Sequence, residues 1–374
     1  MTERNLKWTD KKFSFLRKVL NYFPFLLAIL VFICTRYSIH HPGFVEKYYS
    51  LGLYPSLASG ISAISNLTHY SLWDIFWIVI SLLVISGIVL VFLKRLKLKI
   101  FLLRFIQMIT LIYSLFYLSW GFNYFRPGIE ARLGWQITDR KENDFRALLD
   151  TLICNVNRTY TEVDYSEYKE IEAHLEDSYK NLSSQLGITW PCGTRNPKTI
   201  LISSLFAKSG VSGYFGPLFN EVHINHYQLP GDYAFTLAHE KAHQLGLPNE
   251  AEANLAAFVV CTSSTDNRLR YSGYVHVLLY FLNDCRQMSD YKSYLKKIDT
   301  RVLSDLRHRK SYYDNLRNRT FEGIQEAANN AYLKSQNIEK GIENYNQVVS
   351  LVMNWYKNHG MFQPDETEIF AEIN

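Results

Sequence analysis

Three long apolar runs near the N-terminus limit the folds open to this chain. They lie at about residues 19–36, 72–93 and 100–120, and only Arg104 and Gln107 interrupt the third run. A helix needs about 20 apolar residues to cross a bilayer; the second and third runs reach this length and the first is just long enough. Buried helices of a soluble core are the alternative, but three runs with basic flanks favour insertion. Residues 19–120 are therefore predicted to form a three-helix membrane region in contact with the lipid bilayer.

The basic residues around these runs predict their orientation. Residues 1–18 contain six basic and two acidic residues, and residues 94–104 contain five basic and no acidic residues. Because positively charged flanks stay in the cytoplasm, both stretches are predicted to be cytoplasmic. Three crossings then place residues 121–374 outside. We expect a multi-pass membrane protein with a cytoplasmic N-terminal tail and an extracytoplasmic C-terminal domain.

The topology also explains the net charge of +5. The two cytoplasmic stretches hold more positive charge than the whole chain, so the remainder is acidic. One basic cluster in the outer domain, at residues 307–310, is expected on a solvated helix face. The sequence therefore predicts no nucleic-acid binding.

An H-E-x-x-H motif, His239-Glu240-Lys241-Ala242-His243, lies in the middle of the outer domain. Breaks before and after it predict a helix over about 233–245. Residues four apart share one helix face, so the two imidazoles can bind the same metal ion. Glu240 is rotated by about 100° from His239, which suits a group that acts on metal-bound water. The spacing predicts a Zn²⁺ site with Glu240 as the catalytic base.

A catalytic zinc ion needs a third protein ligand, and two glutamates follow the motif. Asn249 is a good N-cap for a second helix, and Glu252 then has the position of its capping-box partner. Glu250, at the first helical position, remains able to turn towards the metal, with Asn254 one turn later to hold it from behind. We therefore favour Glu250 over Glu252 as the third ligand. Asn249 itself is excluded, because a neutral amide is a poor zinc ligand.

Several of these elements resemble known families. The run from Glu250 to Asn254 is similar to the E-x-x-A-[DN] element of gluzincin-type peptidases, in which the first glutamate binds zinc. From His239 to Asn254, the chain resembles a bacterial family of membrane proteins of unknown function. That family has three N-terminal transmembrane helices and an H-E-x-x-H domain. Further similar elements lie at residues 210–217, 270–274, 331–334 and 341–345. The resemblance implies a zinc hydrolase fold in a protein of the bacterial inner membrane, with the C-terminal domain in the periplasm. It supplies no substrate.

Residues 121–374 are expected to form one zincin-like, mainly α domain of the α+β class, with a small sheet. Apolar spacing indicates helices within 139–186 and at about 274–282, 303–316, 321–334 and 345–356, and strands at 199–202 and 221–225. The segment 221–225 is a candidate edge strand for binding a substrate backbone, with a plain core strand as an equal alternative. His223 and His226 have no metal-ligand spacing and are expected not to be ligands.

Two further roles are open for residues outside the motif. Tyr271, Tyr274 and His276 are candidates for a donor that stabilises an oxyanion opposite the zinc. Four outer cysteines, an even number in an oxidising compartment, allow one or two disulfides: Cys154, Cys192, Cys261 and Cys285.

Two functions remain as hypotheses. The first is a membrane-anchored, Zn²⁺-dependent metallopeptidase that hydrolyses an unknown peptide or envelope substrate. The second is a non-catalytic envelope-binding module that the metal only braces; a fourth protein ligand, from Glu252, His223 or His226, would favour it. Intramembrane proteolysis is disfavoured, because the residues around the motif are too polar for the depth of a bilayer.

Overall fold

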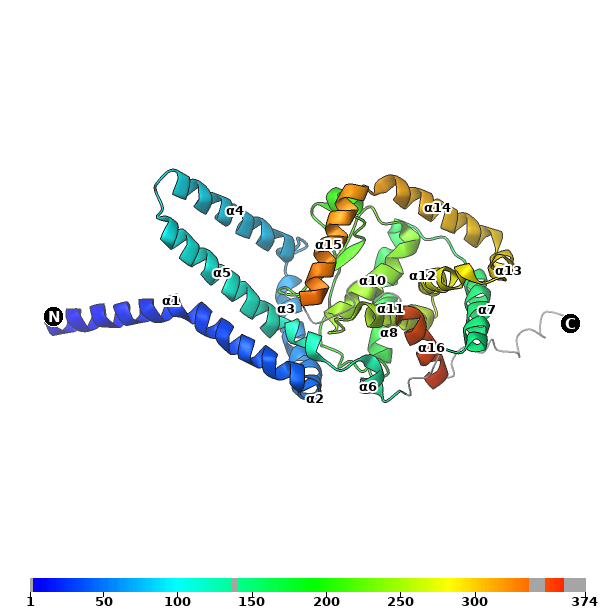
Figure 1. Cartoon of the computed structure of the whole chain (residues 1–374), viewed down its shortest axis with the longest axis horizontal. Helices are drawn as coiled ribbons and strands as arrows, with labels where there is room; N and C mark the ends of the chain where they lie inside the picture. The colour runs from blue at the N-terminus through cyan, green and yellow to red at the C-terminus, as the bar shows by residue number, and fades with distance from the viewer. Residues whose placement is uncertain (1–2, 136–139, 336–346, 360–374) are drawn as a thin grey trace.

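The computed structural model of the chain describes residues 3–135, 140–335 and 347–359. Three long helices project from one end of a larger helical body (Figure 1): α1 (Glu3–His40), α4 (Leu72–Phe92) and α5 (Leu98–Ser119). Asn21–His40 of α1, and α4 and α5 in full, are long and apolar enough to cross a membrane by length and composition. Many of their large apolar side chains are exposed, which is typical of a surface that faces lipid. The three predicted spans therefore coincide with three candidate membrane helices.

The segment between the first two spans is helical, which the sequence analysis missed. It forms α2 (Pro42–Phe44), the π-helix η1 (Val45–Leu53) and α3 (Tyr54–Ser65). It packs against the body rather than projecting as a loop: Glu46 forms an ion pair with Arg126 at 2.6 Å. The amide of Asn220 donates to the Ser62 hydroxyl at 2.7 Å. The membrane helices and the body are thus joined by more than the chain connection at residue 120.

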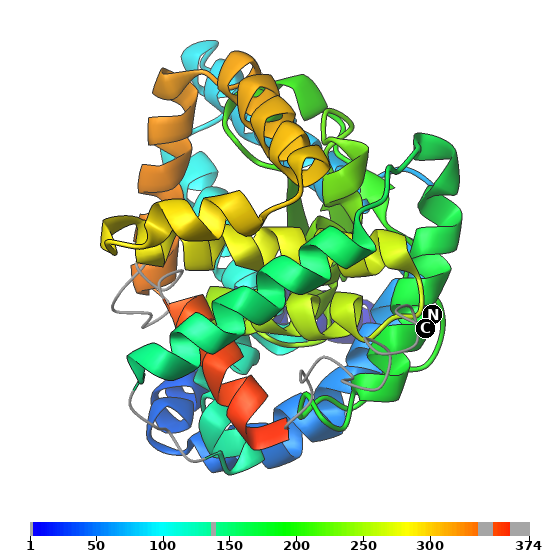
Figure 2. The same cartoon turned by 90° about the vertical axis from the view of Figure 1, so that its right-hand side faces the viewer.

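The body is built around three helices that pack side by side: α10 (Tyr233–Gln244), α11 (Glu250–Thr262) and α12 (Asn267–Asp284). Every residue of α11 from Ala251 to Thr262 is buried. Small side chains allow this close packing, and an added Cβ on Gly273 of α12 would lie 2.8 Å from the Cβ of Cys261. α7 (Glu142–Thr159) and α16 (Gln347–His359) cover this core on the side away from the membrane helices (Figure 2).

The remaining helices surround this core. They are η2 (Gly121–Phe125), α6 (Ile129–Leu133), η3 (Tyr165–Glu167), α8 (Tyr168–Leu182), α9 (Ser203–Lys208), η4 (Pro230–Asp232), η5 (Cys285–Gln287), α13 (Tyr291–Lys297), α14 (Thr300–Leu316) and α15 (Arg319–Ser335). The predicted helices of the outer domain are confirmed within the described residues. The family-like element at 341–345 and the start of the last predicted helix lie outside them.

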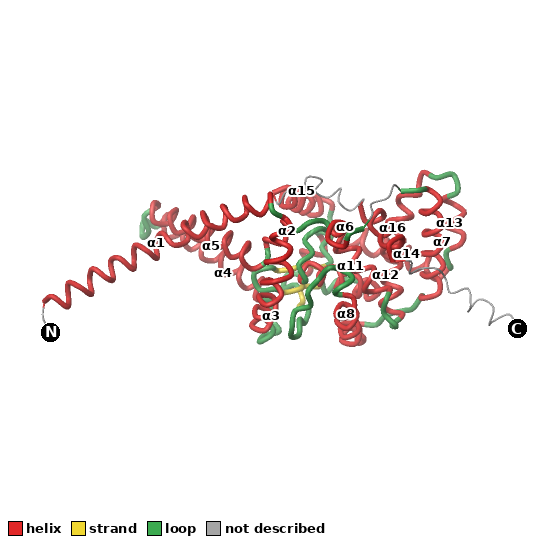
Figure 3. The backbone as a smooth tube through the Cα atoms, turned by 90° about the horizontal axis from the view of Figure 1, so that it is seen from below, coloured by secondary structure: helices red, strands yellow, loops and turns green. Residues whose placement is uncertain are grey.

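A three-stranded sheet lies at the end of the body that faces the membrane helices (Figure 3). Its order is β1 (Lys198–Thr199), β3 (Glu221–Ile224), β2 (Gly213–Gly216), with β1 parallel and β2 antiparallel to β3. Of the two alternatives for 221–225, the plain core strand is confirmed and the edge strand is wrong, because β3 is central and fully buried. The edge strand beside α10 is β2, where the sequence analysis predicted no strand.

The disulfides allowed by the sequence are also not formed. All five cysteines lie in the described part of the chain, and none is paired with another. Cys261 and Cys285 are buried in the core, whereas Cys154 and Cys192 are exposed on the surface.

Candidate metal centre

A tight turn brings the start of α11 beside the end of α10. Gly246 has φ of 87°, the left-handed conformation that glycine adopts most easily, and it ends α10. Asn249 then caps α11, because its side chain accepts hydrogen bonds from the backbone amides of Ala251 and Glu252. Two residues from the membrane side hold the end of α10: Trp120 donates to the carbonyl of His243 at 2.8 Å, and Tyr54 donates to that of Gln244 at 2.5 Å.

This turn brings together the three predicted metal ligands. The Nε2 atoms of His239 and His243 are 3.2 Å apart, and Glu250 Oε2 lies 3.2 Å from the first and 3.7 Å from the second. Metal–ligand bonds of about 2.0–2.1 Å in a tetrahedral site put the ligand atoms about 3.3 Å apart. The spacing of these three donor atoms therefore fits a zinc ion.

The outer ring nitrogens of both histidines have fixed hydrogen-bond partners. His243 Nδ1 donates to the carbonyl of Leu247 at 2.7 Å, and His239 Nδ1 donates to Oδ1 of Asn254 at 3.1 Å. Each bond leaves the lone pair of Nε2 available to bind a metal ion, the arrangement expected of metal-binding imidazoles. The prediction that Asn254 supports Glu250 is wrong. The amide oxygen of Asn254 orients His239 instead.

The electrostatics of the three groups favour a cation. Burial by itself would raise the pKa of Glu250, but the two histidines, His243 above all, lower it. Burial would lower the pKa of His243, but Glu250 outweighs it and raises that pKa to about 9. Without a metal ion, the Glu250 carboxylate thus favours a bound proton on the cluster. A metal ion would take the place of that proton.

Glu240 lies beside this cluster in different surroundings. It is 7 % exposed, and burial raises the pKa of its carboxyl group. The edge strand packs closely against it: a Cβ added to Gly213 would lie 3.0 Å from Glu240 Cγ and 2.9 Å from the His223 carbonyl oxygen. A side chain at position 213 would therefore press on the predicted base.

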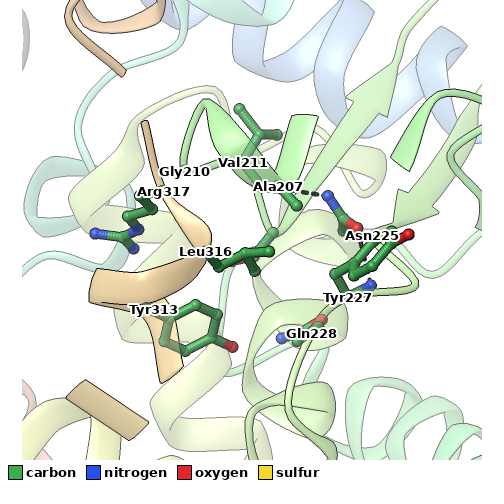
Figure 4. A pocket seen from close by; sticks show the side chains of 10 residues that line it. Ala207, Gly210, Val211, Asn225, Tyr227, Gln228, Tyr313, Leu316 and Arg317 are labelled. Carbon is green, nitrogen blue, oxygen red and sulfur yellow. Dashed lines mark hydrogen bonds between the residues drawn. The ribbon is translucent and has the colours of Figure 1, made fainter. Parts of the chain in front are cut away.

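The cluster opens into a cleft of about 670 Å³, a size typical of ligand sites. We call this space the cleft. Its walls come from β2 and the residues before it, from η2 and the preceding Trp120, and from helices α10, α11, α12, α14 and α15. The lining residues used below are Gly213, Tyr214, Phe215, His239, Glu240, His243, Glu250, His276, Tyr280, Arg309, Tyr313 and Gln325. A separate recess of about 10 Å³ adjoins it, between Ala207, Asn225, Leu316 and Arg317 (Figure 4). That recess has room for about one water molecule, so of these two spaces the cleft is the one that can hold a larger ligand.

The other predicted site residues lie away from the cluster. Glu252 pairs with Arg132 at 2.7 Å and accepts from the backbone amide of Ile129 at 3.0 Å, so it makes neither the predicted capping box nor a contact with the cluster. Tyr271 donates to Asp305 at 2.6 Å and is buried. Tyr274 is buried against Phe258. Neither tyrosine lines the cleft, so both are misplaced as oxyanion donors.

The two extra histidines also stay outside the cluster. His223 is fully buried and bonds through Nε2 to the Ser71 hydroxyl at 2.8 Å. His226 is exposed. In the described part of the chain, His239, His243 and Glu250 form the one group of three such side chains close enough to share a metal ion.

The cleft contains groups that the sequence analysis missed. Arg309, expected on a solvated face, turns inward and pairs with Asp232 at 2.9 Å. It also donates to Nε2 of His276 at 2.9 Å, while Nδ1 of that histidine donates to the Ser272 carbonyl. Burial, followed by the nearby Arg309, lowers the pKa of His276 well below its usual value. Both ring nitrogens of His276 are therefore occupied, and Arg309 is the better candidate for binding negative charge.

Tyr280 is the tyrosine of α12 that does line the cleft. Burial, with Glu250 as a second cause, raises the pKa of its hydroxyl to about 12. It lies one helical turn after His276, and this spacing of four was the available signal in the sequence. Tyr271 and Tyr274 lie on other faces of the same helix.

The sequence of residues 49–353 matches DUF3810, which is described as a protein of unknown function. Searches of curated proteins and of solved structures find no match to the chain. The matched region begins in η1 and includes α4, α5 and every residue of the metal cluster. Because it covers most of the chain, the protein belongs to the DUF3810 family.

Proposed function

We propose that the protein is a membrane-anchored, zinc-dependent metallopeptidase with a zincin-like fold. The observation that carries the proposal is the convergence of His239, His243 and Glu250 on one point, with Glu240 beside them in an open cleft. Two neutral histidines, one carboxylate and an open fourth position are the ligand set of zinc hydrolases.

A zinc ion held by these three residues would supply a Lewis acid and lower the pKa of a bound water. With zinc bound, Glu240 would accept a proton from the attacking water and pass it to the leaving amine. Its raised pKa suits both steps, because the carboxylate must first take a proton and later release it. Arg309 and Tyr280 offer donors within the cleft for the developing negative charge.

The proposed topology puts the N-terminal tail in the cytoplasm of a bacterium and the body in the periplasm. The basic residues of 1–18 and 94–104 support this orientation. The arrangement of the helices agrees with it, since the start of α1 and the turn between α4 and α5 lie at the same end of the molecule, away from the body (Figure 1). A single site facing the periplasm then acts on peptides or envelope proteins.

The experiment is zinc stoichiometry of the full-length protein in detergent, for wild type, Glu250→Gln and Glu252→Gln. The two substitutions are chemically identical and two residues apart, but only Glu250 lies in the cluster. We expect one zinc per chain in wild type and Glu252→Gln, and loss of zinc in Glu250→Gln. A folded wild-type protein that binds no zinc would contradict the proposal.

Hydrolysis is then tested on a peptide library analysed by mass spectrometry. New peptide ends should appear with the zinc-loaded protein, disappear after chelation and return when zinc is restored. Zinc binding without hydrolysis of any library member would favour the non-catalytic, metal-braced module instead.

A further inference from the structure

A second, larger cavity lies between the membrane helices and the sheet. We call it the membrane cavity; its volume is about 1160 Å³. Its walls are apolar side chains of α4, α5 and the segment around α9 and β2, among them Trp77, Ile78, Leu82, Ile109, Ile112 and Phe206. Asp74 is the one charged residue in its lining, and that carboxylate already accepts hydrogen bonds from Tyr214 and from the amide of Leu201. The space therefore suits an apolar occupant.

The membrane cavity reaches deep into the predicted bilayer. Leu82 lies ten residues into α4, about 15 Å along the helix. This is about half the thickness of the hydrocarbon core of a bilayer. Ile78 and Leu82 are 45 % and 58 % exposed although they line the cavity, so the cavity opens sideways on the surface that faces lipid.

The membrane cavity shares a wall with the cleft. Tyr214 and Phe215 of β2 line both spaces, as does Gln325 of α15, which stands between the membrane helices and α10 (Figure 1). The strand is only four residues long, and its first residue, Gly213, lies so close to Glu240 that an added Cβ would be 3.0 Å from Glu240 Cγ. A strand rises about 3.4 Å per residue, so the membrane cavity begins only a few residues along β2 from the predicted base, Glu240.

This shared wall is held in place by hydrogen bonds to the start of α4. The backbone amides of Leu72 and Trp73 donate to Glu221 of β3 at 3.2 and 2.9 Å. Ser71 bonds to His223 of the same strand, and Tyr214 of β2 donates to Asp74. The membrane helix and the sheet thus form one unit, and the cavity between them is part of the fold.

We propose that the substrates are membrane-inserted polypeptides, with an apolar helical segment in the membrane cavity and the adjoining extracytoplasmic chain along β2. This inference rests on the proposed peptidase function and specifies its substrate class. A helix about 10 Å wide that rises 1.5 Å per residue fills roughly 120 Å³ per residue, so the cavity accepts about ten residues. The outer edge of β2 is unpaired among the described strands and can bind extended backbone by strand addition.

The proposal fixes the place of cleavage. The scissile bond lies outside the bilayer, within about five residues of the end of the apolar segment, because β2 spans that distance. A soluble peptide of the same cleaved sequence fills the cleft but gains nothing from the membrane cavity.

The test compares two peptides with the zinc-loaded, full-length protein in lipid nanodiscs. One peptide carries an apolar membrane segment of leucine and alanine before a mixed-sequence region, and the other carries the mixed region alone. The membrane cavity is filled by the double substitution Ile78→Trp/Leu82→Trp. The matched control is Val79→Trp/Leu83→Trp, on neighbouring residues of similar exposure, 46 % and 60 %, that do not line the cavity.

We expect kcat/KM for the membrane peptide to fall by about tenfold or more in the cavity-filled protein, as when one or two apolar side chains lose their site. The control pair should cleave it normally, and all variants should cleave the soluble peptide equally. Normal cleavage of the membrane peptide by the cavity-filled protein would overturn this inference and leave the peptidase function standing. Preference for a peptide anchored by a diacyl lipid instead would also overturn it, in favour of a lipoprotein substrate.

A binding measurement keeps the inference testable without turnover. A membrane peptide with a photo-reactive group in its apolar segment should crosslink to α4 or α5 in wild type and in the control pair, but not in the cavity-filled protein. Crosslinking with no hydrolysis would support the membrane site while contradicting the peptidase function. Absence of specific crosslinking would overturn the membrane site itself.

Discussion

Two buried glutamates, Glu240 in the cleft and Glu221 at the junction with the membrane helices, have opposite pKa shifts. They are 7 % and 2 % exposed, so burial alone would raise the pKa of both carboxyl groups. Burial does raise the pKa of Glu240. For Glu221 burial is outweighed by His223, Lys198, Ser65 and the amide of Trp73, which together lower its pKa to about 2.

The difference teaches that the donors around a buried carboxylate, rather than its depth, decide what it does. The Glu240 side chain accepts no hydrogen bond from any described residue, so no donor fixes its carboxyl group in the ionised state. Glu221 accepts from backbone and side-chain donors of three separate segments and stays ionised. Glu240 is thus suited to the proton transfers of the proposed mechanism, whereas Glu221 ties α4 to the sheet.

Replacing the cleft glutamate should give the largest effect on activity. We expect Glu240→Gln to lower kcat/KM by about 10²–10⁴-fold, the usual contribution of a general acid–base group. Its zinc content should stay at the wild-type level, because the residue is not in the ligand set. The metal-free variant should melt no lower than wild type at neutral pH, since it buries no charge. Glu162→Gln, on the surface, is the matched control, and wild-type turnover by Glu240→Gln would rule out the proposed base.

Replacing the junction glutamate should show the opposite pattern. Glu221→Gln leaves the buried Lys198 ammonium without its 2.5 Å carboxylate partner, and breaking such a pair costs about 3–5 kcal/mol. We expect a large drop in melting temperature of the full-length protein in detergent. The double variant Glu221→Gln/Lys198→Met should regain part of the lost melting temperature. Equal melting of Glu221→Gln and wild type would show that this network does not hold the two parts together.

The pH dependence of stability should show the contribution of the ionised Glu221. The folded-state pKa of Glu221 lies below its ordinary value of 4.5, at about 2, so its contribution is complete above about pH 4.5 and is lost as the pH falls towards 2. Wild-type melting temperature should fall across this window more steeply than that of Glu221→Gln. Parallel curves for the two proteins would contradict the assignment.

A smaller effect, on zinc affinity, is expected at Asn254, which orients the ligand His239. Asn254→Ala removes the acceptor that orients His239 at 3.1 Å, and such partners contribute about 10–100-fold to metal affinity. Zinc affinity measured with a competing chelator should fall within that range. His226→Ala, an exposed histidine outside the cluster, should bind zinc as tightly as wild type. Unchanged affinity in Asn254→Ala would mean that the helix alone fixes the imidazole.

The smallest effect concerns the tyrosine that the sequence analysis misassigned. Tyr271→Phe should leave kcat/KM unchanged, because the hydroxyl points to Asp305 and not to the cleft. It should cost about 1 kcal/mol of stability through the lost hydrogen bond. A clear loss of turnover with normal stability would reopen its role in catalysis.

What the sequence could predict follows from distance along the chain. His239, His243 and Glu250 lie on two consecutive helices, so helical spacing and a capping argument are enough to bring them together. The three apolar runs are likewise local signals. The small residues of α11 and the turn at Gly246 also act over a few residues, and the element bounds there were close.

The errors concern pairings between distant segments. Asn254 was assigned to the wrong partner because the angle between α10 and α11 is set by packing, which periodicity does not contain. Arg309 was expected in solvent because its partner, Asp232, lies 77 residues earlier. The order of the three strands was missed because β2 is short and rich in glycine. The helices between the first two spans were missed because their apolar side chains pack mainly on the end of α5 and on η2, which lie more than 50 residues later in the chain.

The bonds between α4 and Glu221 have a consequence for how the protein is made. The ribosome completes the first turn of α4 about 150 residues before it reaches Glu221. Until then the amides of Leu72 and Trp73 lack the acceptor that they have in the finished protein. The α4–α5 hairpin is therefore synthesised before its partner strand, and the body completes these hydrogen bonds by folding onto the start of α4. In the proposed topology, insertion of the hairpin thus comes before assembly of the metal site.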